Sequence, residues 1–230
     1  MNMTEYVFTP DLPVTLPVVG TPQRFPVGRV FCVGRNYPWP DAQGQNRQPP
    51  VFFMKPASCV MDAVGEVPFP SVTEEFVHEI ELVVAIGEGG ANIPESQALA
   101  YVWGYATGLD LTRRDVQRQA KRDGLPWEGA KVFDGAAPMT AIVPVAKAGH
   151  PEGDLWLSVN GQERQRDSLG SQIWSVSEVI SRISQSVALR AGDLIMTGSP
   201  AGVDELRPGD LISAGIDGIG QLEMRVGQRP

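Results

Sequence analysis

The fold and its chemistry centre on residues 77–86, VHEIELVVAI, where two glutamates lie two positions apart in an apolar, β-branched run. Side chains of a strand alternate between two faces, so a strand over Glu79–Ile86 would project Glu79 and Glu81 to the same side. Two neighbouring like charges favour a bound cation. The solvent-exposed face of an edge strand explains the same spacing equally well.

A third carboxylate follows at Asp110, which ends a second apolar, β-prone run over residues 101–109. If the two runs are neighbouring strands, Asp110 can reach the point where Glu79 and Glu81 project. Three hard oxygen ligands without a Cys or His cluster favour Mg²⁺ or Mn²⁺, with Ca²⁺ also acceptable, over Zn²⁺. The sequence therefore predicts a site for one divalent cation.

Further blocks of sequence follow one another in a characteristic order. Together with the HEIE strand, these blocks resemble the fumarylacetoacetate hydrolase family, and within it most closely the short acylpyruvate and fumarylpyruvate hydrolases. The resemblance runs from about Arg29 to the C-terminus. The blocks are CVGRNY at 32–37, FFMKP at 52–56, DLTRRDVQ at 110–117, GLPWEGAKVFD at 124–134, VNG at 159–161 and GDLIMTGSPAGV at 192–203.

The resemblance implies an α+β fold, a mixed and largely antiparallel β-roll of the fumarylacetoacetate hydrolase C-terminal-domain type with a few short helices. We expect one catalytic domain over 29–230, preceded by a proline-rich, irregular N-terminal arm over 1–28 in which a strand could pair loosely. Asn160-Gly161 and Asp217-Gly218 are hairpin signals between strands. The β-prone runs are 30–33, 51–54, 79–86, 102–109, 155–159, 194–197, 211–216 and 222–226.

Two helices are marked by capping patterns. Thr112 with Asp115 resembles a capping box that opens a helix toward Asp123, and Ser175 with Glu178 opens another toward Ser186. The first of these helices starts just beyond Asp110, so its first turn should lie beside the predicted metal.

Composition is that of one compact domain: 230 residues, 42% of them hydrophobic. A net charge of −8 argues against a nucleic-acid partner, and no run approaches the roughly 18 apolar residues of a membrane span. Without a signal-like N-terminus, we expect a cytosolic protein. Cys32 and Cys59 lie in apolar runs typical of reduced core thiols. The resemblance also implies a homodimer, which covers exposed strand edges.

Side chains that bind a small 2-oxo or diketo acid are implied by the same blocks. Arg114 and Gln117 lie three residues apart, on one helical face, and match residues that contact the substrate in the family. Arg35 and Tyr37 lie in the CVGRNY block and are assigned to substrate binding with them. Ser199 stands where the family commonly has Thr, and its hydroxyl could hold a substrate carboxylate.

Lys131 matches the active-site lysine of the family. A divalent cation nearby would lower its pKa by like-charge repulsion, while neighbouring carboxylates would oppose this. Its expected catalytic role is electrostatic: it would stabilise the enolate that develops when a carbon–carbon bond beside a carbonyl breaks.

One segment departs from the family pattern. Related acylpyruvate hydrolases carry N-Y-x-x-H-x-x-E, whose His and Glu activate the attacking water, but residues 36–43 here read NYPWPDAQ. Pro40 and Gln43 replace the dyad, and the prolines disfavour a regular helix. Trp39 would either cover the metal pocket or pack in the core or at a dimer interface. His78, facing away from Glu79, and His150, in a loop, are expected to be structural.

Three functions follow from these patterns. The favoured one is a metal-dependent hydrolase that cleaves fumarylpyruvate or another acylpyruvate and releases pyruvate, as in the catabolism of aromatic compounds, with Asp41 or a metal-activated water as base. The second is an oxaloacetate-type 2-oxoacid decarboxylase or keto–enol tautomerase, which needs enolate stabilisation but no water-activating dyad. The third is a catalytically impaired relative that keeps the metal. Fold alone does not choose among them.

Overall fold

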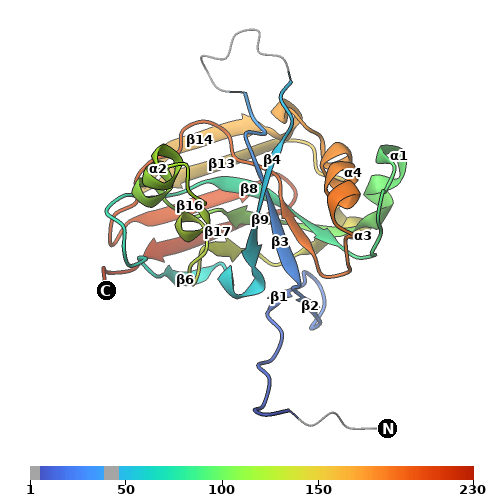
Figure 1. Cartoon of the computed structure of the whole chain (residues 1–230), viewed down its shortest axis with the longest axis horizontal. Helices are drawn as coiled ribbons and strands as arrows, with labels where there is room; N and C mark the ends of the chain where they lie inside the picture. The colour runs from blue at the N-terminus through green and yellow to red at the C-terminus, as the bar shows by residue number, and fades with distance from the viewer. Residues whose placement is uncertain (1–5, 39–46) are drawn as a thin grey trace.

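Two β-sheets form most of the protein, whose computed structural model describes residues 6–38 and 47–230 (Figure 1). The larger, eight-stranded sheet runs in the order β4-β3-β15-β8-β9-β11-β5, with β12 paired to β9. Its pairs are antiparallel except β3–β15 and β5–β11. The strands are β3 (Arg29–Gly34), β4 (Val51–Pro56), β5 (Val60–Asp62), β8 (Ile80–Ile86), β9 (Val102–Leu109), β11 (Ala137–Met139), β12 (Val143–Pro144) and β15 (Leu194–Met196).

The second, five-stranded sheet runs in the order β14-β13-β16-β17-β6, with a parallel β17–β6 pair. Its strands are β6 (Val64–Val67), β13 (Asp154–Val159), β14 (Gln162–Ser168), β16 (Leu211–Ile216) and β17 (Gly220–Val226). Two small antiparallel pairs complete the strands: β1 (Thr15–Pro17) with β2 (Arg24–Pro26), and β7 (Phe76–Val77) with β10 (Thr112–Arg113). The architecture confirms the predicted mixed, largely antiparallel β-roll.

The central strand β8 is buried along its whole length, because both of its faces are covered. Leu82 and Val84 belong to an apolar cluster that also takes inward side chains from the five-stranded sheet. Val83 and Ala85 face a second cluster, which includes Leu16 and other residues of the β1–β2 segment. Glu79 and Glu81 share the parity of Val83 and Ala85, so alternation directs them away from the second sheet.

The helices are short: α1 (Glu95–Ala98), α2 (Arg114–Arg122), α3 (Val145–Ala148) and α4 (Val176–Ser186). At α4 the predicted capping box is present, with Ser175 and Glu178 bonded reciprocally. The predicted box at Thr112 is wrong. Thr112 lies in β10, where it pairs with Val77, and α2 begins only at Arg114 without a side-chain cap. Strand pairing therefore outcompetes the cap at that position.

The predicted β-prone runs all contain strands, and both predicted hairpins are formed, at β13–β14 and β16–β17. Within the proline-rich arm, β1 and β2 form an antiparallel pair, while the division at residue 28 stays a prediction. Cys32 and Cys59 are buried and free, as predicted. Within the described ranges, no helix is long and apolar enough to cross a membrane.

Candidate metal centre and substrate pocket

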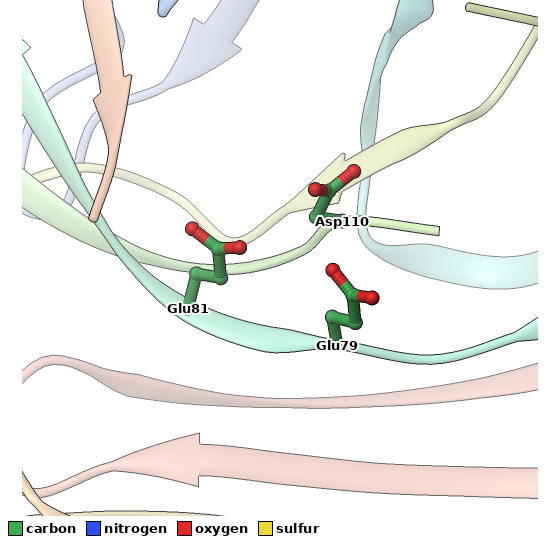
Figure 2. Close-up of side chains that lie close together, drawn as sticks. All are labelled: Glu79, Glu81 and Asp110. Carbon is green, nitrogen blue, oxygen red and sulfur yellow. The ribbon is translucent and has the colours of Figure 1, made fainter. Parts of the chain in front are cut away.

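Three carboxylates meet at one end of the β8–β9 pair (Figure 2). Glu79 precedes β8, Glu81 lies in it opposite Gly108 of β9, and Asp110 follows β9. The Asp110 N–H donates to the Glu79 carbonyl at 2.8 Å, which fixes the two strand ends side by side. One oxygen from each carboxylate lies within 4.8 Å of the others. The structure thus brings together Glu79 and Glu81, predicted from strand alternation, and Asp110, predicted from its place at the end of the second run.

Two buried lysines neutralise part of this negative charge. Lys131 Nζ donates to Glu79 Oε2 at 2.8 Å and to Asp110 Oδ2 at 2.6 Å. Lys55, on β4, places its Nζ 2.9 Å from Asp110 Oδ1. No role was predicted for Lys55, although a lysine in the apolar run FFMKP is a signal, because a buried charge needs a partner.

Arg114 adds a third cation, since its Nη2 lies 3.2 Å from Glu79 Oε1. The three cations pair with Glu79 and Asp110, and with all three carboxylates ionised the formal charge of the cluster is zero. A bound divalent cation would leave an excess positive charge, which an anionic 2-oxo acid could balance. The electrostatics favour joint binding of a cation and an anion.

The carboxylates differ in how well they are compensated. Burial and the charges of Asp110 and Glu79 raise the pKa of Glu81 well above its usual value, although the Gly198 N–H donates to it at 2.6 Å. Burial also acts against ionised Asp110, but Lys131 and Lys55 outweigh it and lower the pKa of Asp110. For Lys131, burial lowers the pKa, but Asp110 and Glu79 raise it further, so the net shift is upward.

The cluster suits a hard divalent cation. Asp110 Oδ1 is buried and has no aligned hydrogen-bond donor in the described chain, despite the 2.9 Å approach of Lys55, so a lone pair is available. Burial and the neighbouring carboxylates favour the protonated form of Glu81, and a bound cation would replace that proton. Three oxygen donors match the preferences of Mg²⁺, Mn²⁺ or Ca²⁺.

A pocket of about 530 Å³ opens over the carboxylates. Every residue that the sequence predicted for metal or substrate binding lies on its walls. These residues are Arg35, Tyr37, Glu79, Glu81, Asp110, Arg114, Gln117, Lys131 and Ser199.

The predicted substrate-binding residues are held in defined positions. Arg114 Nη1 donates to Gln117 Oε1 at 2.9 Å, as expected for neighbours on one helical face. Arg35 follows β3 with a φ of 60°, a left-handed conformation that is unusual for arginine and typical of functional sites. The buried Tyr37 hydroxyl has no hydrogen-bond partner in the described part of the chain. Tyr37 itself lines the pocket.

The segment after β15 closes the other side of the pocket. Thr197 N–H donates to the Leu82 carbonyl at 3.0 Å, and the Gly198 N–H bonds Glu81. Ser199 follows, and its Oγ accepts from Gln165 Nε2 at 2.9 Å. Gln165, fully buried on β14, was not predicted, because it stands among polar residues in QERQRDS and nothing distinguishes it there.

The two histidines take structural positions, as predicted. His78 is fully buried and contacts Gln165 Oε1 through Nδ1 at 2.9 Å, on the side away from the carboxylates. Burial lowers the pKa of His78. His150 is exposed, and its Nδ1 lies 2.6 Å from the Tyr105 hydroxyl. In the segment over residues 36–43 that departs from the family pattern, Trp39, Pro40, Asp41 and Gln43 lie outside the described residues, whereas Pro38 lines the pocket.

A second cavity of about 540 Å³ lies beside Tyr105, His150 and the start of α4. Its walls carry one acidic residue, Glu152, and no cluster of ligating groups among the residues that line it. Charged groups converge instead in the pocket over the carboxylates, which we take as the candidate site.

The fold and site define a class of enzyme with an acidic cluster, suited to a divalent cation, at the mouth of a β-roll. Comparison with known proteins agrees: residues 29–227 match the family model described as fumarylacetoacetate (FAA) hydrolase C-terminal. The chain belongs to the fumarylacetoacetate hydrolase family.

Two relatives narrow the comparison. The crystal structure of fumarylpyruvate hydrolase from Pseudomonas aeruginosa, in complex with Mn²⁺ and pyruvate, is similar with a TM-score of 0.93 and 44% identity. The match covers 98% of this chain and 100% of the Pseudomonas aeruginosa chain. The mitochondrial oxaloacetate tautomerase FAHD1 from Mus musculus is 41% identical over 200 residues, 86% of this chain and 90% of the relative. The family thus includes at least two reaction types among similar proteins.

Proposed function

We propose that the protein is a divalent-metal-dependent hydrolase that cleaves a carbon–carbon bond of fumarylpyruvate or another acylpyruvate and releases pyruvate. The observation that carries the proposal is the Lys131 ammonium held between Glu79 and Asp110 in the pocket. Similarity to a fumarylpyruvate hydrolase structure in complex with Mn²⁺ and pyruvate, at 44% identity over 98% of the chain, supports it.

The reaction needs stabilised negative charge beside a carbonyl. Water adds to the acyl carbonyl carbon, the bond from that carbon to the neighbouring methylene breaks, and its electron pair enters the pyruvate part as an enolate. A proton then returns to the methylene carbon, which gives pyruvate and the free acid. A divalent cation held by Glu79, Glu81 and Asp110 would supply Lewis-acid polarisation of the 2-oxo acid.

The protein's own residues bind and orient the substrate. Lys131 faces the position of the enolate oxygen as a fixed cation, and its interaction strengthens as charge develops in the transition state. Arg114, already held by Glu79 and Gln117, retains further N–H donors for a carboxylate. Arg35, Tyr37 and Ser199 supply a charge and two hydroxyl groups for the rest of the substrate.

The test is the product spectrum of the purified protein with Mg²⁺ or Mn²⁺. Fumarylpyruvate, shorter acylpyruvates and oxaloacetate are incubated separately, and the products are identified by NMR. We expect pyruvate and the corresponding free acid from acylpyruvates. Turnover of oxaloacetate alone would contradict the proposal.

Oxaloacetate tautomerase or decarboxylase activity is the second candidate. No histidine is present among the residues described on the pocket walls, and Pro40 and Gln43 stand at the dyad positions of related hydrolases. Keto–enol exchange needs enolate stabilisation but no activated water. Pro40→His combined with Gln43→Glu restores the dyad of related hydrolases. A gain in acylpyruvate hydrolysis favours the first candidate, and brisk oxaloacetate turnover without a gain favours the second.

No turnover of any substrate, with Mn²⁺ and pyruvate still bound, would identify an impaired relative. A homodimeric state and a cytosolic location stay predictions, the second because a similar relative is mitochondrial. Light scattering at micromolar concentration tests the dimer.

A further inference from the structure

Gln165 uses all of its hydrogen-bonding capacity in a buried position between the two sheets. Its Oε1 accepts from the Ile80 N–H at 3.2 Å and meets His78 Nδ1 at 2.9 Å. Its Nε2 donates to Ser199 Oγ at 2.9 Å and to the Pro200 carbonyl at 2.8 Å. This amide links the strand that carries the acidic cluster to the loop on the opposite side of the pocket.

The backbone decides which way the amide points. A backbone N–H can only donate, so Ile80 requires the oxygen, and a carbonyl can only accept, so Pro200 requires the nitrogen. Both requirements select the same orientation. His78 Nδ1 must then carry a proton, and its Nε2, buried without a partner in the described chain, carries none.

The same logic sets the polarity of Ser199. Its oxygen accepts a hydrogen bond from Gln165, and a serine hydroxyl has one hydrogen of its own to donate. Within the described residues, the Gln165 amide is the partner of Ser199 Oγ, and Ser199 lines the pocket. The Ser199 proton is therefore left for an acceptor in the pocket.

The loop that carries Ser199 is pinned against β14. Gly202 has a φ of 98°, and a Cβ built there would lie 2.0 Å from the Arg164 carbonyl oxygen. Only glycine permits this approach. Because the contact neighbours Gln165, the serine and the amide keep a fixed separation.

We propose that Gln165 is a positioning residue that holds the Ser199 hydroxyl as a hydrogen-bond donor toward a carboxylate of the bound 2-oxo acid. The inference deepens the proposed function and rests on it only in taking this pocket as the 2-oxo acid site. Gln165 touches no ligand itself. Its effect on binding passes through Ser199.

Gln165→Glu reverses the polarity with little change in shape. In Gln165→Glu an oxygen replaces Nε2 and faces both the Pro200 carbonyl and Ser199. The Pro200 carbonyl can only accept, so any proton on this oxygen turns toward it, and Ser199 must donate to a lone pair of the same oxygen. The Ser199 hydroxyl is then no longer available to donate a hydrogen bond to a ligand. Ser199→Ala removes the same donor directly, while Ser199→Thr keeps it.

The experiment measures pyruvate binding to the Mn²⁺-loaded protein by calorimetry. We expect Gln165→Glu and Ser199→Ala each to weaken pyruvate about tenfold or more, the range for one hydrogen bond to a charged group. The double variant should bind no more weakly than the weaker single variant. Ser199→Thr should bind within about threefold of wild type. Ser184→Ala, which removes another buried hydroxyl on α4, is the matched control and should bind like wild type.

Wild-type affinity in Gln165→Glu would overturn the proposal, and so would a double variant that sums both losses, since simple repulsion by a new carboxylate would add. A second measurement needs no variant to fold: ¹⁵N chemical shifts of metal-free wild type report the His78 tautomer. Protonated Nδ1 supports the assigned amide orientation, and an Nε2–H tautomer overturns it. These readouts use no turnover, so failure of the hydrolase proposal is distinguishable.

Discussion

The two sides of the pocket are built from different interactions. In the carboxylate wall, formed by Glu79, Glu81 and Asp110, Lys131, Lys55 and Arg114 form ion pairs with Glu79 and Asp110, while Glu81 accepts a backbone hydrogen bond from Gly198. The amide wall, formed by Gln165 and Ser199, is held by neutral hydrogen bonds of fixed direction. The first wall can exchange a proton or a cation, whereas the second can only present a donor.

This difference determines how much a substitution on each wall should lower the free energy of unfolding. Removing one member of a buried ion pair leaves an uncompensated charge and costs about 3–5 kcal/mol. A neutral hydrogen bond contributes only about 0.5–1.5 kcal/mol net. We therefore expect substitutions on the carboxylate wall to affect both stability and metal binding, and those on the amide wall to affect ligand orientation.

The largest effect is expected for Asp110→Asn. It leaves Lys55 and Lys131 facing one carboxylate fewer in a buried site, so the free energy of unfolding should fall by about 3–5 kcal/mol. Mn²⁺ affinity should fall by about 100-fold or more, in line with the loss of about 3 kcal/mol of ligand interaction. Denaturant unfolding and a Mn²⁺ titration measure the two quantities.

Asp123→Asn provides the control, because Asp123 is an exposed acid at the end of α2 that bonds only Gln119 among the side chains described. It should leave Mn²⁺ affinity unchanged. Equal Mn²⁺ binding in Asp110→Asn and wild type would show that the carboxylate wall is not the metal site.

Lys131→Met separates charge balance from catalysis on the same wall. Its removal should lower kcat by about 10²–10³-fold with a smaller change in KM, because the enolate charge is greatest in the transition state. Mn²⁺ affinity should be preserved or increased, since Glu79 and Asp110 lose a competing cation. Lys147→Met, at an exposed position on α3, is the control. A change confined to KM would refute the electrostatic role.

Sequence alone could predict the carboxylate wall because two local rules coincide there. Alternation puts Glu79 and Glu81 on one face, and Asp110 ends the neighbouring strand within a recognisable block. Thr112 shows the limit of local rules: a capping pattern is present, but pairing with Val77 takes the residue into a strand. Such competition is decided by tertiary contacts.

The amide wall could not be predicted for a related reason. Gln165 is one polar residue among several on β14, and it becomes important only because the second sheet places it against Ile80 and Pro200. Lys55 lay within a quoted block, yet its partner Asp110 is distant in sequence. Contacts between sheets carry no periodic signal along the chain.

A pH series tests the exchange of proton and cation on the carboxylate wall. The pKa of Glu81 is raised above its ordinary value of 4.5, so in the metal-free protein its stabilising contribution is present below that pH and is lost as pH rises through the raised pKa. Mn²⁺ binds the ionised form, and its affinity should rise with pH, by up to about tenfold per unit for one released proton.

Calorimetric titrations between about pH 5 and pH 8 measure this slope. Glu81→Gln removes the titrating group and should bind Mn²⁺ weakly with a flatter pH dependence. A flat profile in the wild-type protein would mean that Glu81 is ionised before the metal binds, and the contrast between the two walls would lose its basis.

The smallest loss of stability is expected for substitutions of His78, which bonds Gln165 on the side away from Ser199. His78 supplies one neutral hydrogen bond to Gln165, so His78→Leu should cost about 1 kcal/mol, a fall in Tm of about 2–4 °C for a domain of this size. His78→Asn places an amide N–H near the position of Nδ1 and should recover most of that loss. Thermal unfolding of the two variants makes the comparison. Equal losses would mean that packing of the ring, and not its donor, matters. Mn²⁺ affinity should stay unchanged in both, because the imidazole lies on the opposite face of the strand from the carboxylates.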